Sequence, residues 1–291
     1  MPMTQTVSEP LSVSSPPTKR AEALEWMDDE IDKVAASIDG TLSGIVNDAF
    51  SAYADTLTAA GDMAAFDNMG VQWSDYLVRE LEPYWAAMYR ESALNAALAA
   101  DLPPAVAATT LPIWERLVNE AAVTYARNAT NRLRGVGDAV WRAIRERVAK
   151  SLQLGLGTEA LKAEIEQGIK DELDRVTSFS EFRADTIART ETVGAFVNGD
   201  RGGAEALGDY GPVEHYWDAH LDKRTRPSHR RADGQTKPWK EPFIVGGVAM
   251  LHPHARGAPP EEVVNCRCTE GFLYPGDTRP DGSKVPEAKG P

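Results

Sequence analysis

Residues 213–221 read VEHYWDAHL, and this stretch marks the point at which the chain changes from helix to sheet. Apolar and polar side chains alternate along it, with Val213, Trp217 and Leu221 on the same side. A period of two residues is typical of a half-buried strand. We therefore expect a strand here, at the start of a small sheet.

Further short strands are expected downstream. Residues 243–250 read FIVGGVAM, in which a pair of glycines joins two apolar runs. Two-residue glycine loops are typical of tight β-hairpins. Residues 265–269, NCRCT, are predicted to form another strand, and residues 260–264 a single helical turn with a proline at its start. Long polar loops connect these elements.

Helices are predicted throughout the chain before residue 211. Leu24, Ile31, Ile38 and Ile45 recur every seven residues, as in a helix that packs along one seam. Helical periodicity and helix-ending signals such as Pro103-Pro104 give the remaining segments. We expect these helices over 62–102, 111–154, 159–169 and 180–207.

The fold class is therefore α+β, with a mainly helical N-terminal region followed by a small C-terminal α+β module of short strands and long polar loops. Residues 1–20 are rich in serine, threonine and proline, and residues 275–291 have no periodicity, so we expect both to be flexible tails. The helical region covers 21–154, and the C-terminal module covers 155–274.

Composition limits the function. The chain has 291 residues and a net charge of −13, which is unusual for a free-standing nucleic-acid binder. No run approaches the roughly 18 apolar residues that span a bilayer, so no membrane partner is expected. The first 20 residues also lack the apolar segment of a secretory signal. Two cysteines in a chain of this length favour the reducing cytoplasm over a disulfide scaffold.

Cations gather in one segment of this acidic chain. Between positions 223 and 240 there are seven basic side chains and one acidic side chain, Asp233. Such a segment is either a solvated loop or a patch for a DNA backbone or an acidic partner surface. The basic residues are Lys223, Arg224, Arg226, Arg230, Arg231, Lys237 and Lys240.

Both cysteines lie in the tetrapeptide 265–268, at positions 266 and 268. On a strand, residues two apart point to the same face. With His229, and Asp222 or Asp233 nearby in sequence, Cys266 and Cys268 could form a tetrahedral zinc site. The alternative is two small buried thiols that pack in the core, which needs no cofactor. A disulfide between them is disfavoured, because so short a loop forces strained geometry.

The polar residues of the module suggest a second role, which is to hold a long loop in one shape. A carboxylate can accept hydrogen bonds from arginine and from the backbone of its own loop. Ordering each loop residue costs about 1–2 kcal/mol, so such ties are needed where little apolar surface is buried. The candidates for this role are Glu191, Asp222, Arg224, Arg226, His229 and Asp233.

Catalysis is the third alternative. His229 with Cys266 or Cys268 and an acidic residue supplies the parts of a nucleophilic system, as in a hydrolase or a nucleotide-processing enzyme. The sequence has no phosphate-binding glycine loop, no HExxH and no GxSxG. We therefore expect a protein that is not an enzyme.

Four separated elements together resemble the phage Mu F-like minor head protein family. They are Arg189-Thr190-Glu191-Thr192, then Trp217 with Asp222-x-Arg224-Thr225-Arg226-x-x-His229, then Asp233-Gly234, and finally Asn265-Cys266-Arg267-Cys268. The resemblance covers roughly residues 150–270, in order and in spacing, and leaves the helical region outside it.

The resemblance implies a structural protein of a tailed phage. Such a protein would bind the portal protein and the major capsid or scaffold protein during procapsid assembly. It would lie inside the head near the portal, after passing through the host cytoplasm, and would contact or help to move the packaged DNA during packaging or ejection. A DNA-binding or zinc-stabilised module, and the enzyme described above, are the alternatives.

Overall fold

The computed structural model describes residues 11–13, 25–38, 40, 64–153 and 185–287. The expected helix over 159–169, the tail over 1–10 and 14–20, and the last residues, 288–291, lie outside this description. The expected α+β class is confirmed, because long helices precede a small region of short antiparallel strands. Among the described residues, no helix combines the length and the apolar character needed to cross a bilayer.

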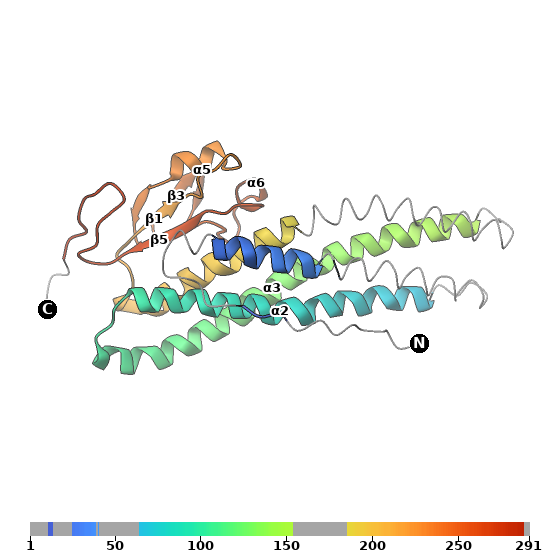
Figure 1. The fold of residues 1–291 in the computed structure, drawn as a ribbon, viewed down its shortest axis with the longest axis horizontal. Coiled ribbons are helices and arrows are strands. Elements are labelled where there is room, and N and C mark those ends of the chain that lie inside the picture. Colours follow the sequence, from blue (N-terminus) through green and yellow to red (C-terminus); the bar gives the residue numbers. More distant parts are fainter. Residues whose placement is uncertain (1–10, 14–24, 39, 41–63, 154–184, 288–291) are drawn as a thin grey trace.

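Two long helices form an antiparallel hairpin along the length of the molecule (Figure 1). Helix α2 spans Ala64–Ala99 and α3 spans Pro104–Gln153. We expected α3 to begin near Leu111, but it begins at the second proline of the Pro103-Pro104 pair. Proline is favoured in the first helical turn, where its missing N–H would have no helical partner. The same prolines therefore end one helix and start the next.

Two further helices complete the helical core. The helix at 25–38 buries Met27, Ile31, Val34 and Ile38, so the described part of the expected seam faces the core. The helix at 185–206 lies between the hairpin and the C-terminal strands (Figure 1). Trp114 Nε1 on α3 donates to the carbonyl of Gly203 on this helix at 2.9 Å, and Ser92 Oγ on α2 donates to the carbonyl of Phe196 at 2.6 Å.

The C-terminal module begins after η1 (Gly208–Tyr210) with strand β1, Glu214–Asp218, within the stretch where alternation predicted a strand. β1 is the central strand of an antiparallel sheet in the order β2-β1-β5, where β2 spans Thr236–Pro238 and β5 spans Thr269–Leu273. β3 (Phe243–Val245) and β4 (Val248–Met250) form the expected hairpin. Its two loop glycines have φ of 60° and 85°, a backbone region that side chains disfavour.

Three expectations for this module were wrong. Residues 265–268 of the expected strand at 265–269 instead form a loop, and β5 begins only at Thr269, because β1 pairs with residues 269–273. The segment expected to be a polar loop contains a short helix, α5 (Pro227–Ala232), and the strand β2. Residues 275–287, expected to be flexible, fold back, and Arg279 there pairs with Glu214 of β1 at 2.6 Å.

A buried carboxylate joins this sheet to the helix at 185–206. The Glu270 side chain on β5 has 0% exposure, and its Oε1 accepts from Arg201 Nη1 at 2.7 Å. The same oxygen lies 2.5 Å from His215 Nδ1 on β1, and His215 Nε2 lies 2.9 Å from the carbonyl of Glu241. A buried charge is tolerated only where charged and hydrogen-bonding partners surround it. Glu270 therefore fixes where the sheet lies against the helix.

Replacement of Glu270 by alanine is expected to lower the free energy of unfolding by about 3 to 5 kcal/mol, because it leaves Arg201 buried without this partner. The control is Glu205→Ala, which removes the second acidic partner of Arg201 but changes a side chain with 51% exposure. The control substitution should lower the free energy of unfolding by less than about 1 kcal/mol. Urea denaturation followed by circular dichroism measures both, and equal losses for the two variants would refute this account.

Candidate functional site

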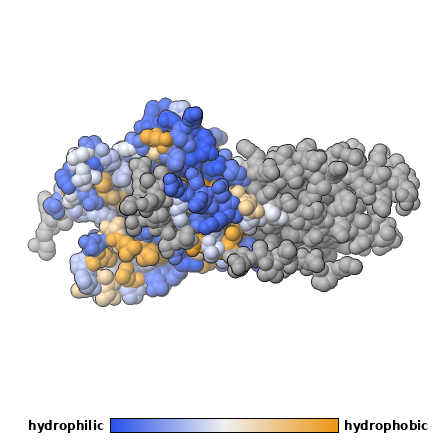
Figure 2. Space-filling model, in the orientation of Figure 1, coloured by the Kyte–Doolittle hydropathy of each residue, from blue (hydrophilic) through white to orange (hydrophobic). Residues whose placement is uncertain are grey.

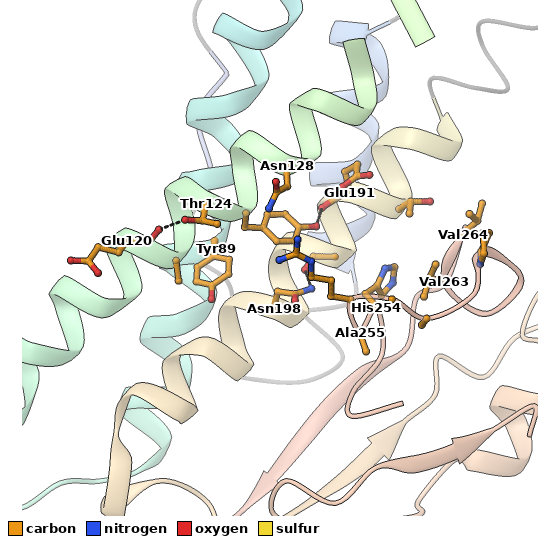
Figure 3. A pocket seen from close by; sticks show the side chains of 18 of the residues that line it. Tyr89, Glu120, Thr124, Asn128, Glu191, Asn198, His254, Ala255, Val263 and Val264 are labelled. Carbon is orange, nitrogen blue, oxygen red and sulfur yellow. Dashed lines mark hydrogen bonds between the residues drawn. The ribbon is translucent and has the colours of Figure 1, made fainter. Parts of the chain in front are cut away.

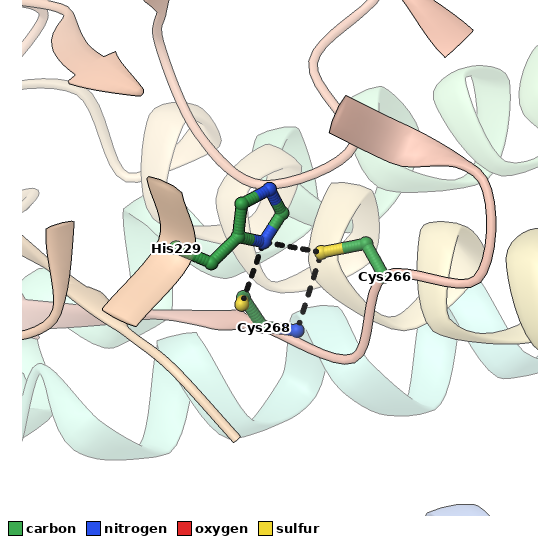
Figure 4. Close-up of side chains that lie close together, drawn as sticks. All are labelled: His229, Cys266 and Cys268. Atoms are coloured by element: carbon green, nitrogen blue, oxygen red, sulfur yellow. Dashed lines mark hydrogen bonds between the residues drawn. The ribbon is translucent and has the colours of Figure 1, made fainter. Parts of the chain in front are cut away.

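His229, Cys266 and Cys268 come together in the core of the C-terminal module (Figure 4). His229 Nδ1 lies 3.2 Å from Cys268 Sγ and 3.5 Å from Cys266 Sγ. His229 is buried, each cysteine has 2% exposure, and neither forms a disulfide. The structure thus brings together three side chains that are up to 39 positions apart in the sequence.

Short elements that begin with proline position these side chains. His229 lies on α5, whose first residue is Pro227, and its ring meets Trp217 of β1 edge-on at 5.4 Å between ring centres. The cysteines follow α6 (Pro260–Val263), which starts at the proline expected to open a helical turn. Between α6 and Cys266, the chain turns at Asn265 in the left-handed region, with φ of 57°. This turn aims both sulfur atoms at His229.

The imidazole and the thiols influence one another's protonation. The hydrogen bond from Cys266 and the contact with His229 lower the pKa of Cys268 despite its burial, whereas that same hydrogen bond and burial raise the pKa of Cys266. Burial opposes a charge on His229, but its contacts with Cys268 and Glu262 outweigh burial and raise the pKa of His229. The contacts within the trio therefore favour the thiolate form of Cys268.

Burial decides between the chemical roles of this trio. A catalytic cysteine must be reached by its substrate and lies in a partly exposed environment. Here both sulfur-bearing residues are in the core cluster with Trp217, Phe243 and Met250. The arrangement can pack thiols or hold a metal ion, but it presents no accessible nucleophile.

Asp222 ties the loop before α5 to the Cys-x-Cys loop. Its carboxylate accepts from the backbone N–H of Arg224 at 2.7 Å and from Thr225 Oγ1 at 3.2 Å. It also accepts from the guanidinium of Arg267, the residue between the two cysteines. Burial opposes ionisation of Asp222, but these hydrogen bonds outweigh it and hold the pKa of Asp222 well below its usual range.

The other candidates for holding the loop lie in several places. Arg224 Nε is 3.5 Å from the Asp222 carboxylate, and Arg226 Nη2 donates to the carbonyl of Val264 at 2.5 Å. Asp233 Oδ1 accepts from the backbone N–H of Ala219 at 2.9 Å, which joins the end of α5 to the end of β1. Glu191 is buried on the helix at 185–206, where Tyr125 Oη donates to its backbone carbonyl at 3.1 Å.

The seven basic residues do not form one surface. Lys223, Arg224, Arg230 and Arg231 are exposed on α5 and the loop before it. Arg230 also donates to the backbone carbonyls of Asp222 and Thr225, so part of its role is internal. Lys237 lies on β2 opposite His215, and Lys240 shares a hollow with Glu205 and Asp209 at the far end of the 185–206 helix.

Sequence reasoning missed a cavity of about 880 Å³ between the helices and the C-terminal module (Figure 3). Tyr125 of α3, Glu191 and Asn198 of the 185–206 helix, and His254 of the loop after β4 line it. Burial lowers the pKa of His254 to about 4, so its ring is neutral at pH 7. A feature of the sequence that could have indicated this cavity is the spacing of four residues between Thr190, Gly194 and Asn198. Such spacing places them on one face of a helix, and all three line the cavity.

Comparison with known proteins agrees with the resemblance in the sequence. Residues 142–270 match the family described as Phage Mu protein F like protein. This segment is similar to that family, and we call it the Mu F-like segment. The Mu F-like segment holds all the residues of the trio and of the Asp222 contacts, and most of the helical region lies outside it.

Two curated proteins share part of this sequence. The minor head protein GP7 of Bacillus phage SPP1 is 34% identical over 97 residues, which are 33% of this chain and 31% of that protein. An NAD(+)–arginine ADP-ribosyltransferase, EFV, of Enterococcus faecalis is 32% identical over 125 residues, which are 43% of this chain and 25% of that protein. The chain thus spans about a third or less of these relatives. No solved structure matches.

Replacement of Asp222 by alanine is expected to lower the free energy of unfolding by about 1 to 3 kcal/mol at pH 7, because the buried guanidinium of Arg267 loses its acceptor. The pKa of Asp222 is lower in the folded chain than the unfolded value of about 3.9. This stabilisation is therefore fully present above the unfolded value and is lost as the pH falls through the folded one.

Urea denaturation at decreasing pH measures this difference between the wild type and Asp222→Ala. Asp209→Ala, which changes an exposed aspartate of η1, is the control and should have little effect at any pH. A difference that grows as the pH falls, or an equal loss in the control, would contradict the assigned role.

Proposed function

We propose that the chain is a structural minor head protein of a tailed phage, not an enzyme. Its support is the Mu F-like segment over residues 142–270, together with the name of the SPP1 relative. In this proposal the protein is taken into the procapsid by contact with the portal, the shell or the scaffold, and stays inside the head near the packaged DNA.

The observation that supports protein binding is an apolar surface on the helical region. Figure 2 shows apolar side chains gathering over the closed end of the α2–α3 hairpin. We call this surface the hairpin patch; exposed large residues near this end of the two helices are Leu94, Leu98, Leu111 and Ile113. Scattered apolar residues are normal on a surface, but apolar side chains that gather in one place are typical of sites where proteins associate.

The position of the hairpin patch suits docking to another head protein. It lies outside the Mu F-like segment, so the two parts of the chain can have separate roles. The net charge of −13 disfavours non-specific binding of this helical surface to DNA. An apolar centre with a polar surround is instead typical of protein interfaces.

Ile113→Lys is expected to reduce the number of copies per particle about tenfold or more, which corresponds to about 1.4 kcal/mol of binding free energy. A lysine placed in an apolar interface loses hydration without gaining a partner. The measurement is quantitative mass spectrometry of particles assembled from the portal, shell and scaffold proteins of the same phage together with this chain.

The matched control is Ile244→Lys. Ile244 has 55% exposure against 56% for Ile113, but it lies on β3 and not on the α2–α3 hairpin. The two variants should have the same circular dichroism spectrum and melting temperature. Equal incorporation of Ile113→Lys and the wild type would rule out the hairpin patch as the docking surface, and absence of the wild-type chain from particles would contradict the function itself.

Direct contact with DNA is a second candidate, supported by the exposed cations on and before α5. Such contact would weaken steeply with salt, because each neutralised phosphate releases counterions. Retention of the chain on double-stranded DNA, measured in low and in moderate salt, should then depend on Lys223, Arg224 and Arg231. Equal retention of the wild type and a variant with all three changed to glutamine would exclude it.

A further inference from the structure

We propose that His229, Cys266 and Cys268 bind a zinc ion that holds the core of the C-terminal module together. Within the described residues, they are the group of histidine, cysteine and acidic side chains whose ligand atoms converge as a metal site requires. This inference is independent of the phage role, because it concerns what stabilises the module and not what the module contacts.

The distances fit a zinc ion. In a tetrahedral site with Zn–S of about 2.3 Å and Zn–N of about 2.0 Å, the ligand atoms lie about 3.5 to 3.8 Å apart. The Nδ1 atom of His229 is 3.2 Å and 3.5 Å from the two sulfur atoms, and all three ligand atoms lie within 4.8 Å of one another. Both Nδ1–Sγ distances are therefore within a few tenths of an ångström of the separation that a bound zinc ion requires.

The imidazole is oriented as a metal ligand would be. His229 Nε2, the nitrogen turned away from the sulfur atoms, lies 2.8 Å from Glu262 Oε2. Ser228 Oγ donates to the same carboxylate oxygen at 3.1 Å. Histidine ligands of zinc usually donate their second N–H to a carboxylate in this way, which leaves the other nitrogen free for the metal. A cluster of packed thiols would not require this carboxylate.

The sulfur atoms are also held in place. The backbone N–H of Cys268 donates to Cys266 Sγ at 3.4 Å, and the backbone N–H of His220 donates to the sulfur of Cys268. Arg267, between the two cysteines, is fixed by Asp222. The loop thus presents both sulfur atoms in one direction before any ion arrives.

The ligand set selects the kind of metal. Two thiolates and an imidazole suit zinc, whereas magnesium and calcium prefer oxygen ligands. Two thiolates also neutralise the charge of a divalent ion, so the buried site carries no net charge. Three protein ligands leave the fourth position of the tetrahedron to a water molecule or to a donor outside the described residues.

The first experiment measures the metal in the full chain, purified without chelator from cells grown with added zinc. Elemental analysis should give about one zinc ion per chain. Cobalt substituted for zinc should show thiolate-to-metal charge-transfer absorption, and X-ray absorption at the zinc edge should show two sulfur neighbours. A folded wild-type chain that binds neither zinc nor cobalt would overturn the proposal and leave packed thiols as the explanation.

The second experiment tests the orienting carboxylate with a matched pair of adjacent residues. Glu262→Gln should weaken zinc binding by roughly 10- to 100-fold, measured by competition with a chromophoric chelator. Glu261→Gln is the control, since Glu261 is exposed on the same turn and should leave the affinity unchanged. Equal affinities of the two variants would refute the role of Glu262.

The third experiment tests the ligands themselves. Cys266→Ser, Cys268→Ser and His229→Asn should each lower zinc content at least tenfold, whereas His254→Asn should retain it. His254 approaches the carbonyl of Cys266 from the cavity but is not among the three ligands. Retention of zinc by any of the three ligand variants, or equal loss in His254→Asn, would contradict the assigned geometry. The cobalt spectrum of the wild type gives an answer even if a ligand variant fails to fold.

Discussion

The structure depends on one buried carboxylate, that of Glu270, at the junction between sheet and helix. Its partners come from two other elements, Arg201 from the helix at 185–206 and His215 from β1. Each partner also contacts a backbone carbonyl next to the β3–β4 hairpin. Arg201 donates to the carbonyl of Leu251, and His215 Nε2 lies beside the carbonyl of Glu241. The chain on either side of the β3–β4 hairpin is therefore fixed by the same charge, which must stay paired because it is buried.

The core of the module explains why polar contacts matter so much. Its cluster of buried residues has eight members, and two of them are the cysteines. A core of this size provides little hydrophobic stabilisation compared with the cost of ordering the loops. Small modules usually add cross-links, such as metal ions or dense polar contacts. The Asp222–Arg267 pair and the contacts of His229 with the cysteines both restrain the Cys-x-Cys loop.

The sequence predicted what local pattern determines and missed what long-range pairing determines. The glycine pair at 246–247 specified a hairpin because few other turns accept it, and alternation placed β1 correctly to within a few residues. Cys266 and Cys268 were assigned to a strand because their segment has strand-like composition. Whether a short segment pairs is decided by its partner, and β1 pairs with the residues that follow the cysteines.

In the candidate site, too, some residues could be predicted from the sequence and others depend on long-range contacts. Residue types alone pointed to His229, Cys266 and Cys268, since these side chains are rare in this chain and suited to one chemistry. Glu262, which orients His229, was missed because an acidic residue on a predicted turn looks like ordinary surface. α5 was missed because six residues starting with proline carry too little periodicity to distinguish a helix from a loop. The cavity beside His254 requires three elements to meet, which no local pattern encodes.

The helix at 185–206 connects the hairpin that carries the hairpin patch to the module that carries the exposed cations near α5. On one side it contacts the α2–α3 hairpin through Trp114 and Ser92, and on the other it holds the sheet through Arg201. Tyr274, just after β5, adds a direct contact by donating to the carbonyl of Ala96 in α2 at 3.3 Å. Because these ties are buried or partly buried, the hairpin patch and the cations near α5 hold a set orientation. A head protein that binds the hairpin patch would therefore also determine where the Mu F-like segment faces.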